Sequence, residues 1–125
     1  MKAAPRIMVV LVCGSRAWTN IEAIRQRLSK LPPRSVVIVG EGPGADALVR
    51  EEAARLGFEV LPVGTAPEEM FDLLFDLTTD PAERLVLAFH DDLSASTGTA
   101  AIVVIARRRG VTVEVISERA RSKRL

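Results

Sequence analysis

The sequence is poor in several residue types, and each shortage excludes a class of protein. Its 125 residues include one cysteine, one histidine, one tryptophan and no tyrosine. A single cysteine cannot form an internal disulfide or a cysteine-based metal site. The 17 basic and 16 acidic side chains leave a formal charge of +1. Overall charge therefore gives no reason to expect nucleic acid as a partner.

Long hydrophobic runs are also missing. The first apolar run covers residues 7–13, whereas spanning a bilayer takes about 20 residues. The run ends in the turn sequence CGSR at 13–16 rather than in the small-residue cleavage site of a signal peptide. We therefore expect a cytoplasmic protein that does not bind membranes.

A regular alternation of apolar runs and helical patterns is what the sequence does contain. The apolar runs fall at residues 7–13, 35–40, 58–63, 84–89 and 111–116, and the helical patterns at 20–31, 44–57, 65–77 and 97–110. Such alternation predicts right-handed βαβ crossovers and one parallel sheet covered by helices on both faces. We predict a single doubly wound, Rossmann-like α/β domain over residues 1–125, with five strands in the order 3-2-1-4-5. Its core lies at about 6–116, followed by a basic tail at 117–125.

The prediction of two helices rests on residues at or near their ends. Asn20 is a favourable residue to cap the helix that follows it. Residues 100–106, AAIVVIA, have the composition of a strand. However, Gly98 before them, and three arginines and Gly110 after them, predict a buried helix with cations in its last turn.

Three loops follow strands whose carboxyl ends meet at one edge of the predicted sheet: GSR at 14–16, GEGPGAD at 40–46 and HDDLSASTGT at 90–99. In open α/β sheets, ligands bind at this edge, here where the chain switches direction between the first and fourth strands. Glycines let backbone amides approach an anion such as phosphate, and an arginine can bind it through two hydrogen bonds. The predicted ligand-binding residues are Gly14, Ser15, Arg16, Gly40, Gly42, Gly44, Asp46, Ser96, Thr97, Gly98 and Thr99.

Plainer interpretations exist for some of these residues. The glycines could serve turn geometry alone, and GEGPGAD is neither a Walker motif nor the G-x-G-x-x-G fingerprint. Asp46 could be a first-turn acid of its helix instead of an acceptor for a ribose or a base. A solvated loop is favoured over a metal site for His90 and its neighbours, and a core position is favoured over a nucleophile for Cys13. We predict no metal, no catalytic residue and no cofactor other than a nucleotide-derived ligand.

Together, these motifs resemble the SLOG superfamily of Rossmann-like proteins, in its YspA/YpsA-related branch. The resemblance rests on GSRAWT at 14–19, on the glycine-rich element from Gly40 to Asp46, and on STGT at 96–99 before a helix and a Gly-Val-Thr-Val strand. It covers about residues 7 to 116. It implies a domain that binds or senses a nucleotide or nucleotide-derived ligand through these three loops. It also implies a bacterial or phage-encoded, conflict-related setting and a possible homodimer.

The chain departs from this family in two places. Members usually carry an Ala-Gly-Pro-x-Arg-Asn stretch between the third and fourth strands, but residues 64–84 contain no Arg-Asn pair. The related phosphoribohydrolases use P-G-G-x-G-T-x-x-E, and here Ile102 replaces the glutamate that helps cleave the N-glycosidic bond. The resemblance therefore implies binding without strong catalysis. Two alternatives stay open. One is a nucleoside-monophosphate N-glycosidase that uses Asp46, Asp91 or Asp92, and the other is a protein-interaction module with a vestigial pocket.

Overall fold

The computed structural model describes residues 7–64, 66–91 and 98–117. Its strands are β1 (Val9–Gly14), β2 (Val36–Val39), β3 (Glu59–Pro62), β4 (Arg84–Phe89) and β5 (Thr112–Ile116). Its helices are α1 (Ile21–Leu28), α2 (Ala45–Arg55), α3 (Pro67–Asp76), α4 (Gly98–Arg108) and the short 3-10 helix η1 (Pro81–Glu83). The strands form one parallel five-stranded sheet in the order β3-β2-β1-β4-β5. The predicted fold class and strand order are confirmed.

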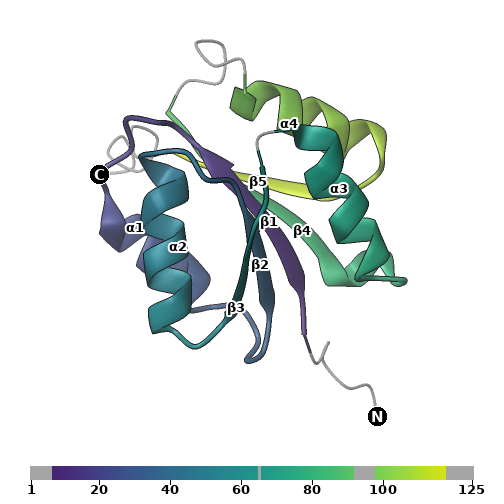
Figure 1. Cartoon of the computed structure of the whole chain (residues 1–125), viewed down its shortest axis with the longest axis horizontal. Helices are drawn as coiled ribbons and strands as arrows, with labels where there is room; N and C mark the ends of the chain where they lie inside the picture. Colours follow the sequence, from purple (N-terminus) through teal and green to yellow (C-terminus); the bar gives the residue numbers. More distant parts are fainter. Residues whose placement is uncertain (1–6, 65, 92–97, 118–125) are drawn as a thin grey trace.

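The sheet is covered on both faces, with α1 and α2 on one side and α3 and α4 on the other (Figure 1). The central strand β1 is buried from both sides, and its residues 9–12 are at most 2% exposed. This double burial explains why the run is apolar at every position instead of alternating with polar residues. No helix in the described part of the chain is long and apolar enough to cross a membrane.

The two locally predicted helix features are both present. The Asn20 side chain accepts a hydrogen bond from the backbone N–H of Ala23 at 3.1 Å and caps α1. The strand-like segment 100–106 lies within α4, where Thr99, Ile102, Val103 and Ala106 are buried. Their spacing puts them on one helical face, so the helical period predicts this element better than β-propensity does.

A partly buried ion pair joins α1 to α2. Glu52 of α2 is 4% exposed, and its Oε1 lies 3.1 Å from Nε of Arg25 in α1 and 3.0 Å from Nη2 of Arg55. Hydrogen bonds from Arg25 and then from Arg55 lower the pKa of Glu52 from 4.5 to about 2. The folded state therefore binds this proton more weakly than the unfolded chain does.

We expect the Glu52 ion pairs to make stability depend on pH in acid. Because the folded pKa is the lower one, the stabilisation is fully present above about pH 4.5 and is lost as the pH falls toward 2. Urea unfolding should show that wild type is more stable than Glu52→Gln. We expect this difference in unfolding free energy, the gap between the two proteins, to be largest at neutral pH and to shrink in acid. Glu51→Gln, at the exposed neighbouring position, is the control, and a gap independent of pH would contradict this assignment.

Candidate functional site

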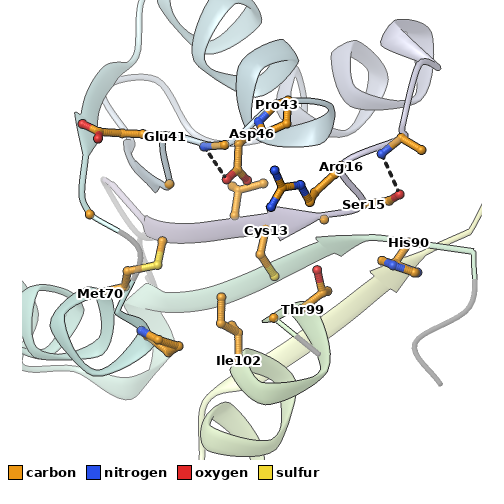
Figure 2. Close-up of a pocket in the computed structure, with 18 residues that line it drawn as sticks. Cys13, Ser15, Arg16, Glu41, Pro43, Asp46, Met70, His90, Thr99 and Ile102 are labelled. Atoms are coloured by element: carbon orange, nitrogen blue, oxygen red, sulfur yellow. Dashed lines mark hydrogen bonds between the residues drawn. The ribbon is translucent and has the colours of Figure 1, made fainter. Parts of the chain in front are cut away.

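A cavity of about 520 Å³ opens at the carboxyl edge of the sheet. The ends of β1 and β4 lie at its centre, where Gly14 pairs with Phe89 and the Ser15 N–H donates to the Phe89 carbonyl oxygen at 2.9 Å. This is the point at which the chain switches direction in the sheet, as the sequence predicted. Figure 2 shows the side chains that enter the cavity from several elements.

Most of the predicted site residues come together around this cavity. Those that line it are Gly14, Ser15, Arg16, Gly40, Gly42, Asp46, Gly98 and Thr99. Gly44 does not line it, and Ser96 and Thr97 lie outside the described residues. The convergence of three distant segments follows from the parallel topology, which brings every strand's carboxyl end to one edge.

Gly44 allows the first two loops to pack closely against each other. The backbone N–H of Ala45 donates to the Ser15 carbonyl oxygen at 2.9 Å, so the GSR loop packs directly on the start of α2. Gly44 has a φ of +72°, and a Cβ at this position would collide with the carbonyl group of Arg16. Only glycine combines this conformation with so close an approach of two backbones.

Gly40 and Gly42 make room for the Asp46 carboxylate and bind it. A Cβ on Gly40 would lie 2.7 Å from Asp46 Oδ2, and the N–H of Gly42 donates to the same oxygen at 3.3 Å. Arg50 also stabilises the loop, because its Nη1 donates a hydrogen bond to the Gly40 carbonyl oxygen at 2.7 Å. The loop therefore places a carboxylate at the cavity wall, with its backbone folded around that group.

The environment of Asp46 disfavours its charge. Burial raises the pKa of this carboxyl above its usual 3.8, while the Gly42 N–H and the nearby Arg50 charge lower it in part. A half-buried carboxylate with a perturbed pKa in a cleft is a common property of binding and catalytic sites. In the described residues, the Gly42 N–H is its one hydrogen-bond donor.

Cys13 lies on the cavity floor below Asp46 (Figure 2). Burial, followed by the Asp46 charge, raises the pKa of its thiol from 9.0 to about 12. Cys13 is 5% exposed, and its thiol donates to the Leu87 carbonyl oxygen, 3.8 Å from Sγ. It therefore stays protonated at neutral pH, which favours the core interpretation over a nucleophile.

Hydrogen-bond donors from the other two loops also line the cavity. The Arg16 side chain is exposed and its guanidinium points into the cavity, with no ion pair among the residues that the structure describes (Figure 2). His90 follows β4, and Gly98 and Thr99 begin α4 at the cavity wall. A helix N-terminus carries a partial positive charge, so the start of α4 suits an anion.

The wall formed by α3 was not predicted from the sequence. Gly64, Pro67 and the buried Met70 line the cavity from that side, and Glu41 lies at its edge. Since β3 ends at the same edge as β1 and β2, the topology would have indicated the start of α3 as a wall. Ile102, noted above for replacing a glutamate, is 7% exposed and also lines the cavity.

The described residues hold no group of three or more histidine, cysteine, aspartate or glutamate side chains that could bind a metal ion. Asp91 does not line the cavity, and its Oδ1 accepts a hydrogen bond from Ser117 Oγ at 3.1 Å. Asp92 lies outside the described residues. Of the three aspartates that the sequence offered as catalytic acids, the structure brings Asp46 into the cavity.

Comparison with known proteins agrees with the expected family. The sequence model of the YspA, cpYpsA-related SLOG family matches residues 8–67, which contain the first two loops of the cavity. The chain is also similar to the bifunctional protein FolD of Chloroherpeton thalassium, at 34% identity over 70 residues. That alignment covers 50% of this chain and 24% of FolD, so the chain matches only about a quarter of its relative's length. Over residues 8–67, the expected resemblance to the YspA, cpYpsA-related SLOG family is therefore confirmed.

Proposed function

We propose that the chain binds a nucleotide or nucleotide-derived ligand in this cavity, as a binder or sensor and not as a strong catalyst. The observation that carries the proposal is that acceptor groups from one loop and donor groups from the other elements line the same cavity. Asp46 and Glu41 line it from the second loop, whereas Arg16, His90 and the start of α4 line it from the other elements. A nucleotide has matching groups, with hydroxyl groups at one part and phosphate at another. The family match supports nucleotide-related binding in general.

The phosphate is assigned to Arg16 and the start of α4. Arginine binds phosphate through two charge-assisted hydrogen bonds, and the partial positive charge at the start of a helix favours an anion. Thr99 adds a hydroxyl at the same place. Ser96 and Thr97 are proposed for the same role from the sequence alone.

The ribose or base is assigned to Asp46. The second loop suits phosphate poorly, because the Gly42 N–H already binds the Asp46 carboxylate and the Ala45 N–H already binds Ser15. The carboxylate would also repel an anion at this point. It can instead accept hydrogen bonds from sugar hydroxyls or from an amino group of a base.

A thermal-shift screen tests the proposal with AMP, GMP, ADP, ADP-ribose, NAD and cyclic dinucleotides. A ligand that binds only the folded state at 100 times its Kd stabilises it by about 2.7 kcal/mol, which raises the melting temperature. We expect a shift with at least one ligand, and its loss in Arg16→Ala. Arg107→Ala is the control, because Arg107 is exposed at the far end of α4. A well-folded protein that shifts with none of these ligands would contradict the proposal.

A nucleoside-monophosphate N-glycosidase is the second candidate, because Asp46 is in the cavity with a raised pKa. It would have to act without the family's glutamate, whose place Ile102 takes. Incubation with nucleoside monophosphates, followed by chromatography for free base, tests this candidate. Release of base that is abolished in Asp46→Asn would establish it, and intact substrate would exclude it.

The interaction-module alternative receives less support from α3. A docking surface on this helix would need exposed apolar residues, but Met70, Phe71 and Leu74 are buried in the core against the sheet. Leu77, just beyond the helix, is 45% exposed. One exposed leucine is ordinary for a protein surface.

A further inference from the structure

A second cavity, of about 380 Å³, lies between residues 16–19 and the first turns of α2. It is lined by Arg16, Ala17, Trp18, Thr19, Gly44, Ala47 and Leu48. Arg16 and Ala17 line the first cavity as well. The two cavities are therefore neighbours that share the loop after β1 as a common wall.

Trp18 is the one buried residue among those that line the second cavity, and it forms the floor. Trp18 is 5% exposed, and its ring packs edge-on against Phe89 with 5.7 Å between ring centroids. Its indole N–H already donates to the Asn20 carbonyl oxygen at 2.9 Å. Because the polar group of this ring is already paired, the ring can offer a ligand apolar contact.

The walls of the second cavity are mostly apolar. Ala47 and Leu48 are half-exposed on α2, and the exposed Thr19 adds a hydroxyl group. No acid lines this cavity among the described residues. Apolar walls with few polar groups are typical of sites that bind the ring of a small molecule and fix it with one or two hydrogen bonds.

We propose that the second cavity is a subsite for the second half of a two-part ligand, a dinucleotide or a nucleotide conjugate. One nucleoside would occupy the first cavity, the linking phosphates would pass Arg16, and the second ring would lie against Ala47 and Leu48. This inference rests on the proposed nucleotide binding and names the class of ligand. Each cavity lies within the range of about 300–1,000 Å³ that is usual for small-molecule sites.

The test compares the affinity for a dinucleotide with that for its own mononucleotide, NAD against AMP and pGpG against GMP, by calorimetry on the wild-type chain. In the pair that binds, we expect the dinucleotide to bind at least about tenfold more tightly, because the second ring adds its own contacts. Ala47→Phe fills the second cavity, so it should reduce the dinucleotide affinity to that of the mononucleotide and leave mononucleotide binding unchanged. Ala54→Phe is the control, since Ala54 is exposed two turns further along α2 and lines neither cavity.

A second variant keeps the test decisive if Ala47→Phe fails to fold. Thr19→Phe fills the same cavity from the opposite wall, at an exposed loop position. Equal affinity for dinucleotide and mononucleotide in the wild type would overturn the subsite while leaving nucleotide binding in place. An equal loss of both affinities in the filled variants would also overturn it. If no mononucleotide and no dinucleotide binds, the proposed function itself fails, and the subsite with it.

Discussion

Replacing Gly44 with alanine is expected to lower the free energy of unfolding by about 3 kcal/mol. The new Cβ has to adopt a positive φ of +72° and would collide with the Arg16 carbonyl group. Relief of this collision requires the GSR loop to move away from α2, which breaks the hydrogen bond from Ala45 to Ser15. Urea denaturation of wild type and variant measures the loss. Because Arg16 moves with its loop, nucleotide binding should also weaken.

Gly57→Ala separates the cost of the positive φ from the cost of the collision with the Arg16 carbonyl group. Gly57 follows α2 and also has a positive φ, +90°, but a Cβ there would have nothing within 4 Å. Its replacement should cost about 1 kcal/mol, from backbone conformation alone. If both variants lose the same amount, the contact between the first two loops is not what requires glycine at position 44.

Replacing Asp46 with asparagine is expected to weaken nucleotide binding roughly tenfold to a hundredfold, without destabilising the ligand-free protein. Hydrogen bonds to a charged group contribute about 1.5–3 kcal/mol, which sets the size of the loss. The variant keeps an oxygen to accept the Gly42 N–H. Calorimetry with the ligand found by thermal shift, together with urea unfolding of the ligand-free protein, measures both effects.

The pH dependence of the Asp46 variant gives a second readout. Burial raises the folded pKa of Asp46 above 3.8, so ionisation costs stability as the pH rises through the folded pKa. Asp46→Asn should therefore be at least as stable as wild type at neutral pH, and this advantage should disappear in acid, where wild type is protonated. Glu41→Gln, at an exposed position of the same loop, is the control. A less stable variant at neutral pH would instead support the first-turn acid interpretation, in which the charge stabilises α2.

The fold could be predicted because its information is local and repetitive. Continuous apolar runs mark strands covered on both faces, and residues such as Thr99, Ile102, Val103 and Ala106 have the spacing of a helical face. With strands and helices assigned, the right-handed crossover rule leaves few topologies. The residues of the candidate site followed from the same reasoning, because loops after parallel strands must share one edge.

The roles of the individual glycines and the shape of the cavity walls could not be predicted from the sequence, because they depend on the tertiary structure. In the sequence, Gly40, Gly42 and Gly44 look alike, as three glycines of one turn. Their roles differ because of their neighbours in space: Gly44 meets the carbonyl of Arg16, whereas Gly40 makes room for the Asp46 carboxylate. No local pattern encodes such contacts, since they depend on how two loops pack.

Periodicity and chain order were sufficient to predict the parallel sheet, its carboxyl edge and the segments that reach that edge. Three features became visible in the folded structure: Asp46 is half-buried above Cys13, Met70 lines one wall of the cavity, and a second cavity shares Arg16 with the first. These features arise from side-chain packing between segments far apart in the chain. The free energy of that packing depends on three-dimensional shape, which a linear pattern of residue types does not carry.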